Sequence, residues 1–376
     1  MRSVFVLSAL AAVLPALGAP TVSPLTKRDT YIIKIKPGVS QADFISALTS
    51  GLTHPDSAIK YTYSVIPAVA AYIASADISA VRGMKDVEYI EQDQVLSLSV
   101  DQERRDPAPD NESGSCPKPS FAEDGGEGVT VYGIDTGIKT DHDCFDGRAT
   151  WGAAFPDISL KTDDHGHGTH TAGTVIGKYY GVARKAKMVS VKVLNAAGSG
   201  QTTDVVAGVN YACEHFEKGG KLPSIATMSL GGGVSTALDQ AVESCIKKGM
   251  HFTIAAGNDN KDAKDYSPAR VSTANTVGAI DYTCKKASFS NFGPALDIQA
   301  FGVGVTSAWI GVGKNDTKTI SGTSMATPYV AGVLAVALGK SGQMAPEDLT
   351  NALKYHASAG ALDFSEDTTK DVARLW

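Results

Sequence analysis

The sequence has no excess of basic residues: 34 Lys and Arg stand against 40 Asp and Glu, so the 376 residues carry a formal net charge of −6. Proteins that bind nucleic acid usually concentrate positive charge, and this balance argues against such a partner. Long apolar runs are also missing after the N-terminal segment, and none approaches the roughly 20 residues of a membrane-spanning helix. We expect a monomeric globular protein with no nucleic-acid or membrane partner.

Cysteine is scarce, and its number is odd. The five cysteines leave at least one thiol unpaired in any set of disulfides, and none has the CxxC spacing typical of zinc sites. Cys213 and Cys245 lie in consecutive segments with helical spacing, so we favour this disulfide, although the sequence leaves other pairings open. The remaining cysteines are Cys116, Cys144 and Cys284.

The N-terminal apolar run is too short and too broken for a membrane anchor. It follows Arg2, is interrupted by Pro15 and ends in small residues including Gly18, in the sequence MRSVFVLSALAAVLPALGAP. This pattern is typical of a secretory signal peptide, which we assign to 1–18. We therefore expect a secreted, extracellular protein, and the sequons at Asn111 and Asn315 are candidate glycosylation sites.

Two regions with the composition of folded domains are separated by a polar stretch. Residues 29–98 read as strand, helix, strand, strand, helix and strand, which predicts a small antiparallel sheet with two helices on one face. Residues 99–128 are rich in Pro, Gly, Asp and Glu and indicate a linker and mature N-terminal segment, with a dibasic pair at Arg104 and Arg105. We assign 129–376 to a second, larger domain.

The larger domain alternates short apolar runs with helical patterns. The runs are VTVYGI, KMVSVKVL, SIATMSL, MHFTIAA and NTVGAI, and the helical segments include HGTHTAGTVIG, TDVVAGVNYACEHFEKG and TALDQAVESCIKKG. Buried strands that alternate with helices predict an α/β fold with a mostly parallel sheet covered on both faces. In such sheets the functional crevice lies at the carboxyl ends of the strands.

Four polar residues fall at this predicted rim. Asp135 and Asn258 follow apolar runs, His167 opens a glycine-rich helical segment, and Ser324 enters the helix expected from Met325 to Leu338. Singly, each has a structural explanation such as a turn or a helix cap. Together they supply a nucleophile, a base, a carboxylate that orients the base, and an oxyanion donor, which is the set that acyl transfer requires.

The histidines of this segment allow another interpretation. His165, His167 and His170 form an HxHxxH pattern that could bind zinc. No glutamate stands beside them, and position 168 is glycine, so the pattern is not HExxH. One histidine acting as a proton acceptor beside a carboxylate is the interpretation that we favour.

Five segments resemble the motifs of subtilisin-type serine peptidases, and they are closest to the fungal proteinase K branch. They are DTGIKTDH, GHGTHTAGTV, SLGGG, AAGND and SGTSMATPYVAG, and the chain order Asp, His, Ser is also that of the family. The resemblance extends from Val129 to about Leu353 and implies a three-layer subtilisin-like fold. Residues 31–98 resemble, more loosely, the inhibitory propeptide of the family, which has a ferredoxin-like α+β fold.

The resemblance assigns roles by position. Asp135 would orient His167, His167 would accept the proton of Ser324, and Asn258 with the Ser324 N–H would hold the oxyanion. His165 and His170 would be structural, and catalysis would need no cofactor. Substrate would bind as an extended strand between two edges, above a pocket of small neutral residues. One edge is Gly198, Ser199 and Gly200, and the other is Ser229, Leu230 and Gly231. The pocket is walled by this second edge and by Ala255, Ala256 and Gly257.

The resemblance also implies a structural calcium ion. Asp297 matches a family position whose carboxylate binds calcium together with carbonyl groups, here those of Ser272 and Ala274. An ordinary surface aspartate is the alternative. Departures from the family pattern lie elsewhere: Thr171 replaces a frequent cysteine, and the tryptophan-glycine-leucine pattern near the mature N-terminus is absent.

These features together predict a secreted serine endopeptidase, made as a self-inhibited precursor, which hydrolyses proteins through an acyl-enzyme. The neutral pocket predicts cleavage after apolar or aromatic residues rather than after Lys or Arg. The expected partners are protein and peptide substrates and the chain's own propeptide. The alternative is a secreted elicitor or binding protein that keeps the fold with weak or no catalysis.

Overall fold

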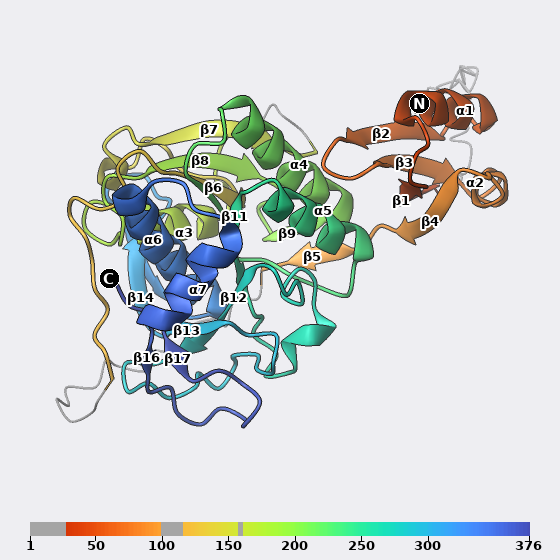
Figure 1. The fold of residues 1–376 in the computed structure, drawn as a ribbon. Helices are drawn as coiled ribbons and strands as arrows, with labels where there is room; N and C mark the ends of the chain where they lie inside the picture. Colours follow the sequence, from red (N-terminus) through yellow and green to blue (C-terminus); the bar gives the residue numbers. More distant parts are fainter. Residues whose placement is uncertain (1–27, 99–115, 157–160) are drawn as a thin grey trace, which may run out of the picture.

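The computed structural model describes residues 28–98, 116–156 and 161–376. The expected signal peptide, the dibasic pair and the Asn111 sequon lie outside these residues. A small domain stands beside a larger body, shown in red to orange and in yellow to blue in Figure 1. Within the described residues, no helix is both long and apolar enough to cross a membrane.

The small domain has the predicted order of elements. Its four antiparallel strands are arranged β2-β3-β1-β4, which is the ferredoxin-like arrangement. The elements are β1 (Arg28–Ile35), α1 (Gln41–Gly51), β2 (Ala58–Tyr63), β3 (Ala68–Ala74), α2 (Ile78–Arg82) and β4 (Val87–Gln92).

Alternation along β1 and β3 gives this sheet two buried faces. Ile33 and Ile35 pack with Phe44 and Leu48 of α1, forming the domain's own core. Ile32, one position away, belongs instead to the core that includes the helices of the larger body. Because successive strand residues point to opposite faces, the same short strands both fold the small domain and dock it.

The larger domain contains a nine-stranded sheet, in which every neighbouring pair is parallel except the terminal pair β16–β17. The strand order is β16-β17-β13-β12-β11-β10-β6-β8-β7. The strands are β6 (Thr130–Asp135), β7 (Ala149–Ala154), β8 (Lys187–Lys192), β10 (Ser224–Met228), β11 (His251–Ala255), β12 (Asn275–Ile280), β13 (Ile298–Phe301), β16 (Ser358–Ala359) and β17 (Asp371–Val372).

Helices cover both faces of this sheet, as predicted. One core includes α4 (Thr202–Lys218) and α5 (Thr236–Lys247), whereas the other includes α3 (His167–Ile176), α6 (Thr323–Ser341) and α7 (Pro346–His356). Shorter elements are β5 (Val95–Ser97), β9 (Ser199–Gln201), the β14 (Val305–Ala308) and β15 (Thr317–Ile320) hairpin, and the 3₁₀ turns η1 (Asp143–Phe145) and η2 (Ala263–Asp265).

The sheet order reverses between β6 and β10. From β6 the chain adds β7 and β8 on one side and then β10 to β13 on the other. Parallel α/β sheets open a crevice at such a reversal, beyond the carboxyl ends of the strands. Asp135 is the last residue of β6 and Ser229 directly follows β10, so both lie at this point.

Two disulfides join distant parts of the chain. Cys213–Cys245 links α4 to α5, which confirms the favoured pair, and Cys116–Cys284 links the segment before β6 to the turn after β12. Cys144 is the buried free thiol, and burial raises its pKa to about 12. This thiol is therefore protonated at neutral pH.

The last strand predicted in residues 29–98, the segment VEYIEQDQVLSLS, is broken in the structure. β4 ends at Gln92, and β5 leaves the small sheet to pair with β9 of the larger body. The break occurs at Asp93, whose carboxylate accepts hydrogen bonds from the Thr203 N–H (3.0 Å) and hydroxyl (2.8 Å) at the start of α4. A carboxylate is favoured at a helix N-terminus, where backbone N–H groups lack partners.

Candidate active site

Asp135 and His167 form a buried pair. The carboxylate at the end of β6 lies 2.8 and 3.0 Å from Nδ1 of His167, the first residue of α3. His167 is 0% exposed and Asp135 is 2% exposed. The carboxylate accepts a hydrogen bond from the Nδ1–H group, and in that tautomer Nε2 is the acceptor nitrogen. Among the described residues, Nε2 has no hydrogen-bond partner.

Asp163, which sequence analysis did not single out, holds α3 in this position. Its buried carboxylate accepts hydrogen bonds from the N–H groups of Gly166 (2.8 Å) and Thr169 (2.9 Å) and from the Thr136 hydroxyl (2.9 Å). Gly166, the N-cap, has φ 102° and no side chain with which to cap. Asp163 therefore caps the helix and joins it to the residue beside Asp135. An acidic residue just before a helical pattern was the available signal.

Glycine at position 168 permits the close approach of α3 to β6. A Cβ atom there would lie 2.1 Å from the carbonyl oxygen of Gly137. The Gly168 N–H also donates to the Thr136 hydroxyl, at 2.9 Å. A larger residue would push His167 away from Asp135.

Ser324 lies in the first turn of α6 and is not its cap. The N-cap is Gly322, and α6 begins at Thr323, two residues earlier than expected. The Ser324 hydroxyl donates to the carbonyl oxygen of Ser229 (3.2 Å), and the Ser229 hydroxyl donates to that of Ser324 (3.0 Å). In the described chain no hydrogen bond joins Ser324 to His167, although α3 packs against α6.

The side chain of Asn258 is held in place by the first residue of α6. Its side-chain oxygen accepts hydrogen bonds from the Thr323 N–H (2.9 Å) and hydroxyl (2.8 Å). These contacts orient the amide with its nitrogen away from Thr323. Asn258 and Ser324 line the same pocket.

This pocket contains most of the predicted substrate-binding residues. Ser229, Leu230, Gly231, Ala255, Ala256 and Gly257 all line it. The pattern missed Asp259, which also lines the pocket and hydrogen-bonds with the Tyr266 hydroxyl. Burial and this carboxylate raise the pKa of Tyr266 to about 12. Asp259 ends the AAGND motif, but the resemblance gave it no role, and its place in the pocket depends on the turn after β11.

The two predicted edges hold a strand from the small domain. β5 pairs antiparallel with β9, and the N–H of Leu98 donates to the carbonyl oxygen of Gly198 at 2.9 Å. On the other side, Ser97 and Gly231 exchange hydrogen bonds of 3.1 and 3.3 Å. Segment 95–98 therefore lies between the edges as an added strand. A Cβ atom at Gly232 would lie 2.5 Å from Leu96, so the body contacts the strand's side chains closely.

The other two histidines do not join His167 around a common point. His170 is buried, its Nε2 faces the carbonyl oxygens of Val305 (3.1 Å) and Lys318 (3.2 Å), and burial lowers its pKa to about 3. His165 accepts from the His167 N–H through Nδ1, at 3.3 Å. No cluster of three His, Cys, Asp or Glu side chains suited to a metal occurs in the described ranges.

Asp297, the carboxylate expected to bind calcium, has both of its oxygens engaged by hydrogen-bond donors. One oxygen of Asp297 is 2.7 Å from the Lys354 ammonium, and the other accepts from the Thr276 N–H at 2.9 Å. With both oxygens engaged by donors, this carboxylate does not fit a calcium ion. Asn315, the described sequon, is exposed in the β14–β15 loop.

Comparisons with known proteins identify the family. Residues 126–371 match the Subtilase family, and residues 30–99 match the Peptidase inhibitor I9 family. The "Subtilisin-like serine protease Pen c 2" of Penicillium citrinum is 44% identical over 343 residues, covering 82% of this chain and 75% of its own length. The "Subtilisin-like serine protease Cla h 9.0101" of Davidiella tassiana is 42% identical over 366 residues, covering 89% and 69%.

A solved structure agrees with the sequence relatives. The crystal structure of a cold adapted subtilisin-like serine proteinase superposes with a TM-score of 0.63 at 42% identity, and the match covers 72% of this chain and 94% of that chain. The predicted fold class and the resemblance are thereby confirmed. The chain belongs to the subtilase family and is a subtilisin-like serine protease preceded by an I9 inhibitor domain.

Proposed function

We propose that Ser324, His167 and Asp135 form the catalytic triad of this protease, with Asn258 as oxyanion donor. The observation that carries the proposal is the buried Asp135–His167 pair at the rim where Ser324 and Asn258 share one pocket. Ser324 Oγ attacks the substrate carbonyl carbon, and its proton passes to His167 Nε2. Asp135 holds the ring and stabilises the imidazolium that forms.

The oxyanion is held by the Asn258 amide nitrogen and the Ser324 N–H, at the positive end of α6. The tetrahedral intermediate then expels the amine, which takes the proton from His167, and water hydrolyses the acyl-enzyme by the same steps. While segment 95–98 fills the cleft, the Ser324 hydroxyl donates a hydrogen bond to the carbonyl oxygen of Ser229. We infer that rotation about the Ser324 side chain redirects it to His167, since catalytic hydrogen bonds often tighten only with substrate.

Replacing Asn258 with leucine tests the oxyanion role. We expect kcat to fall about 10²- to 10³-fold with little change in KM, the loss known for the corresponding asparagine of subtilisin. Thr323→Val is the matched control, because it removes a hydroxyl that contacts Asn258 but leaves the amide nitrogen. Equal kcat for Asn258→Leu and the parent would contradict the assignment.

Substrate binds, in this proposal, where segment 95–98 lies, paired with Gly198–Gly200 on one side and Ser229–Gly231 on the other. Main-chain pairing tolerates many sequences, so the pocket beside Ser324 sets the preference. Its small lining favours apolar or aromatic residues before the cut. Matched peptides with Leu, Phe or Arg at that position should give kcat/KM values at least about tenfold higher for Leu and Phe. Equal rates for Arg would contradict the proposed preference.

We also infer that the precursor cuts itself shortly after Leu98. Segment 95–98 already pairs with both cleft edges, and its last described residue shares a pocket with Ser324. Arg105 lies several residues further along the chain, and each extended residue can add up to about 3.5 Å to the distance from the pocket. A cut near Leu98 therefore fits this segment better than a cut after Arg105. Residues 29–98 then act as the inhibitor of a secreted, monomeric enzyme glycosylated at Asn315 and at Asn111.

A further inference from the structure

Asp297 lies at the junction of β12, β13 and α7. Its side chain is 13% exposed, and its Oδ1 is 2.7 Å from Nζ of Lys354. Its Oδ2 accepts from the Thr276 N–H (2.9 Å), and its own N–H donates to the Thr276 carbonyl oxygen (2.9 Å). The carboxylate is thus fixed to β12 on one side and to α7 on the other.

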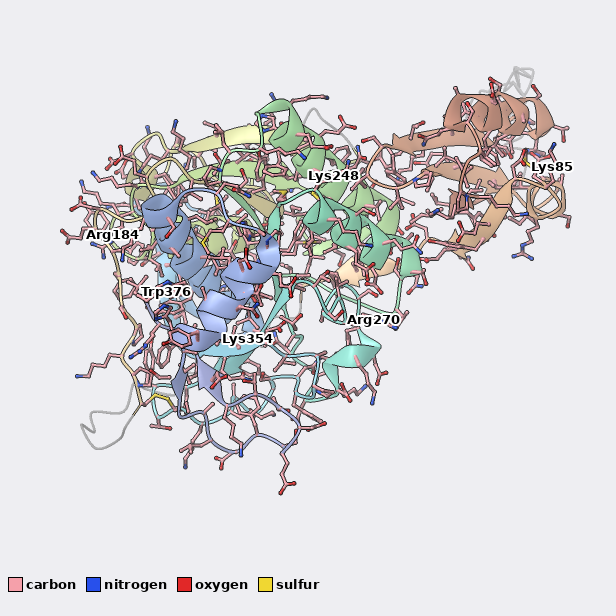
Figure 2. All side chains as sticks on the ribbon, in the orientation of Figure 1. Lys85, Arg184, Lys248, Arg270, Lys354 and Trp376 are labelled. Atoms are coloured by element: carbon pink, nitrogen blue, oxygen red, sulfur yellow. A yellow bond between two sulfur atoms is a disulfide. The ribbon has the colours of Figure 1, made fainter. Side chains whose placement is uncertain are left out.

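Further contacts fix the position of α7 against the larger domain. Leu349 and Leu353 are buried in the core beneath the sheet. The Thr350 hydroxyl donates to the side-chain oxygen of Asn275, at 3.0 Å, one helical turn before Lys354. Residues four apart lie on one side of a helix, so the docked helix presents Lys354 to Asp297. Figure 2 marks Lys354 on α7.

Calcium would need a different arrangement at this place. It takes six to eight oxygen ligands at about 2.3–2.6 Å, which include carboxylates, carbonyl groups and waters. Here a divalent ion at Oδ1 of Asp297 would have to displace an ammonium already in contact. The Lys354 ammonium supplies one positive charge to Asp297 and, unlike calcium, needs no set of oxygen ligands around it.

We propose that the Lys354 ammonium is the resident cation of the Asp297 site and takes the place that the resemblance assigns to calcium. The attachment of α7 to β12 and to the residue that precedes β13 is then independent of metal. Loss of Lys354 leaves Asp297 without its cation, so a calcium ion gains access to the carboxylate, with the Ser272 and Ala274 carbonyl groups as the further ligands that the resemblance implies. Calcium dependence is therefore latent in this chain and is suppressed by one side chain.

Thermal unfolding of the full chain tests this proposal. All proteins carry Ser324→Ala, so that self-digestion does not distort the midpoint, and each is measured with millimolar EDTA and with millimolar calcium chloride. The Ser324→Ala parent should respond to EDTA no more than its Asp297→Asn derivative does. Lys354→Met should unfold about 2 to 4 °C lower in EDTA and recover with calcium. Lys354→Arg, which keeps a cation, should behave as the parent.

Lys247→Met is the matched control, since Lys247 lies on α5 in an exposed pair with Glu243 at 4.0 Å. Its midpoint should not change in either condition. An EDTA-induced fall in the parent that disappears in Asp297→Asn would overturn the proposal, because calcium would then be bound at Asp297 despite Lys354. A Lys354→Met protein with no response to calcium would also contradict it.

Discussion

Replacing Ser324 with alanine is expected to leave the precursor uncut and to lower casein hydrolysis by roughly 10⁶-fold, the loss in kcat known for the nucleophile of subtilisin. The neighbouring Ser229 hydroxyl cannot take over this role, because it donates to the Ser324 carbonyl oxygen. The parent should yield a new N-terminus between positions 99 and 106, and the variant should keep residues 29–98 attached. Gel mobility, N-terminal sequencing and a casein assay measure these outcomes.

Ser341→Ala is the control, since it makes the same chemical change at the exposed end of the same helix. It should mature and hydrolyse casein as the parent does. A fluorophosphonate probe should label the mature parent at Ser324 and should not label Ser324→Ala. Normal maturation of the alanine variant would place the nucleophile elsewhere. A parent that neither labels nor hydrolyses casein would favour the binding-protein alternative.

The rim of the sheet could be predicted because it follows from local patterns. An apolar run that ends in Asp135 places a carboxylate at the end of a buried strand, wherever that strand lies in the sheet. Asn258, after β11, follows the same logic, since parallel strands carry their carboxyl ends to one edge. Ser324 does not, because the strand before it, β15, pairs antiparallel with β14 outside the nine-stranded sheet. The sequence indicated that a carboxylate and a histidine would pair and that Asn258 and Ser324 would lie together, although it did not indicate that the Ser324 hydroxyl would donate to the Ser229 carbonyl oxygen.

Contacts between distant side chains could not be predicted in the same way. Asp163 and Asp259 lie in loops, and Lys354 is an exposed residue of α7; each matters through partners far along the chain or across a turn. Asp93 ended a predicted strand because it caps a helix of the other domain. A charged residue on an exposed face and one in a buried contact look alike in sequence.

The docking of the small domain depends on polar contacts at two helix starts. Asp93 accepts hydrogen bonds at the start of α4. At the start of α5, the Glu91 carboxylate accepts hydrogen bonds from the Ser235 hydroxyl and from the Ala237 N–H. Carboxylates at helix N-termini are favoured by the unpaired N–H groups and the helix dipole. Both residues flank the path into β5, so the contacts that dock the domain also direct the inhibitory strand into the cleft.

Lys60 is the buried cation of this interface. Its Nζ is 2.7 Å from Oδ1 of Asp204 on α4, with the two side chains 8% and 3% exposed. The Tyr61 hydroxyl donates to the same oxygen at 2.8 Å, and Lys60 also donates to the Thr203 hydroxyl at 3.0 Å. Removing one partner of such a pair costs about 3–5 kcal/mol, because the other charge is left buried without a counterion.

Lys60→Met should therefore weaken the hold of the cleaved inhibitor domain by at least about a hundredfold. Casein activity should appear earlier after self-cleavage, and less of fragment 29–98 should copurify with the enzyme. Adding Asp204→Leu should restore retention, because two apolar groups of similar volume can replace a buried ion pair. Lys36→Met, which changes an exposed lysine of the same domain, should leave release unchanged. If the double variant released its inhibitor as fast as Lys60→Met, the loss would come from misfolding of the small domain, and the buried pair would not set the strength of inhibition.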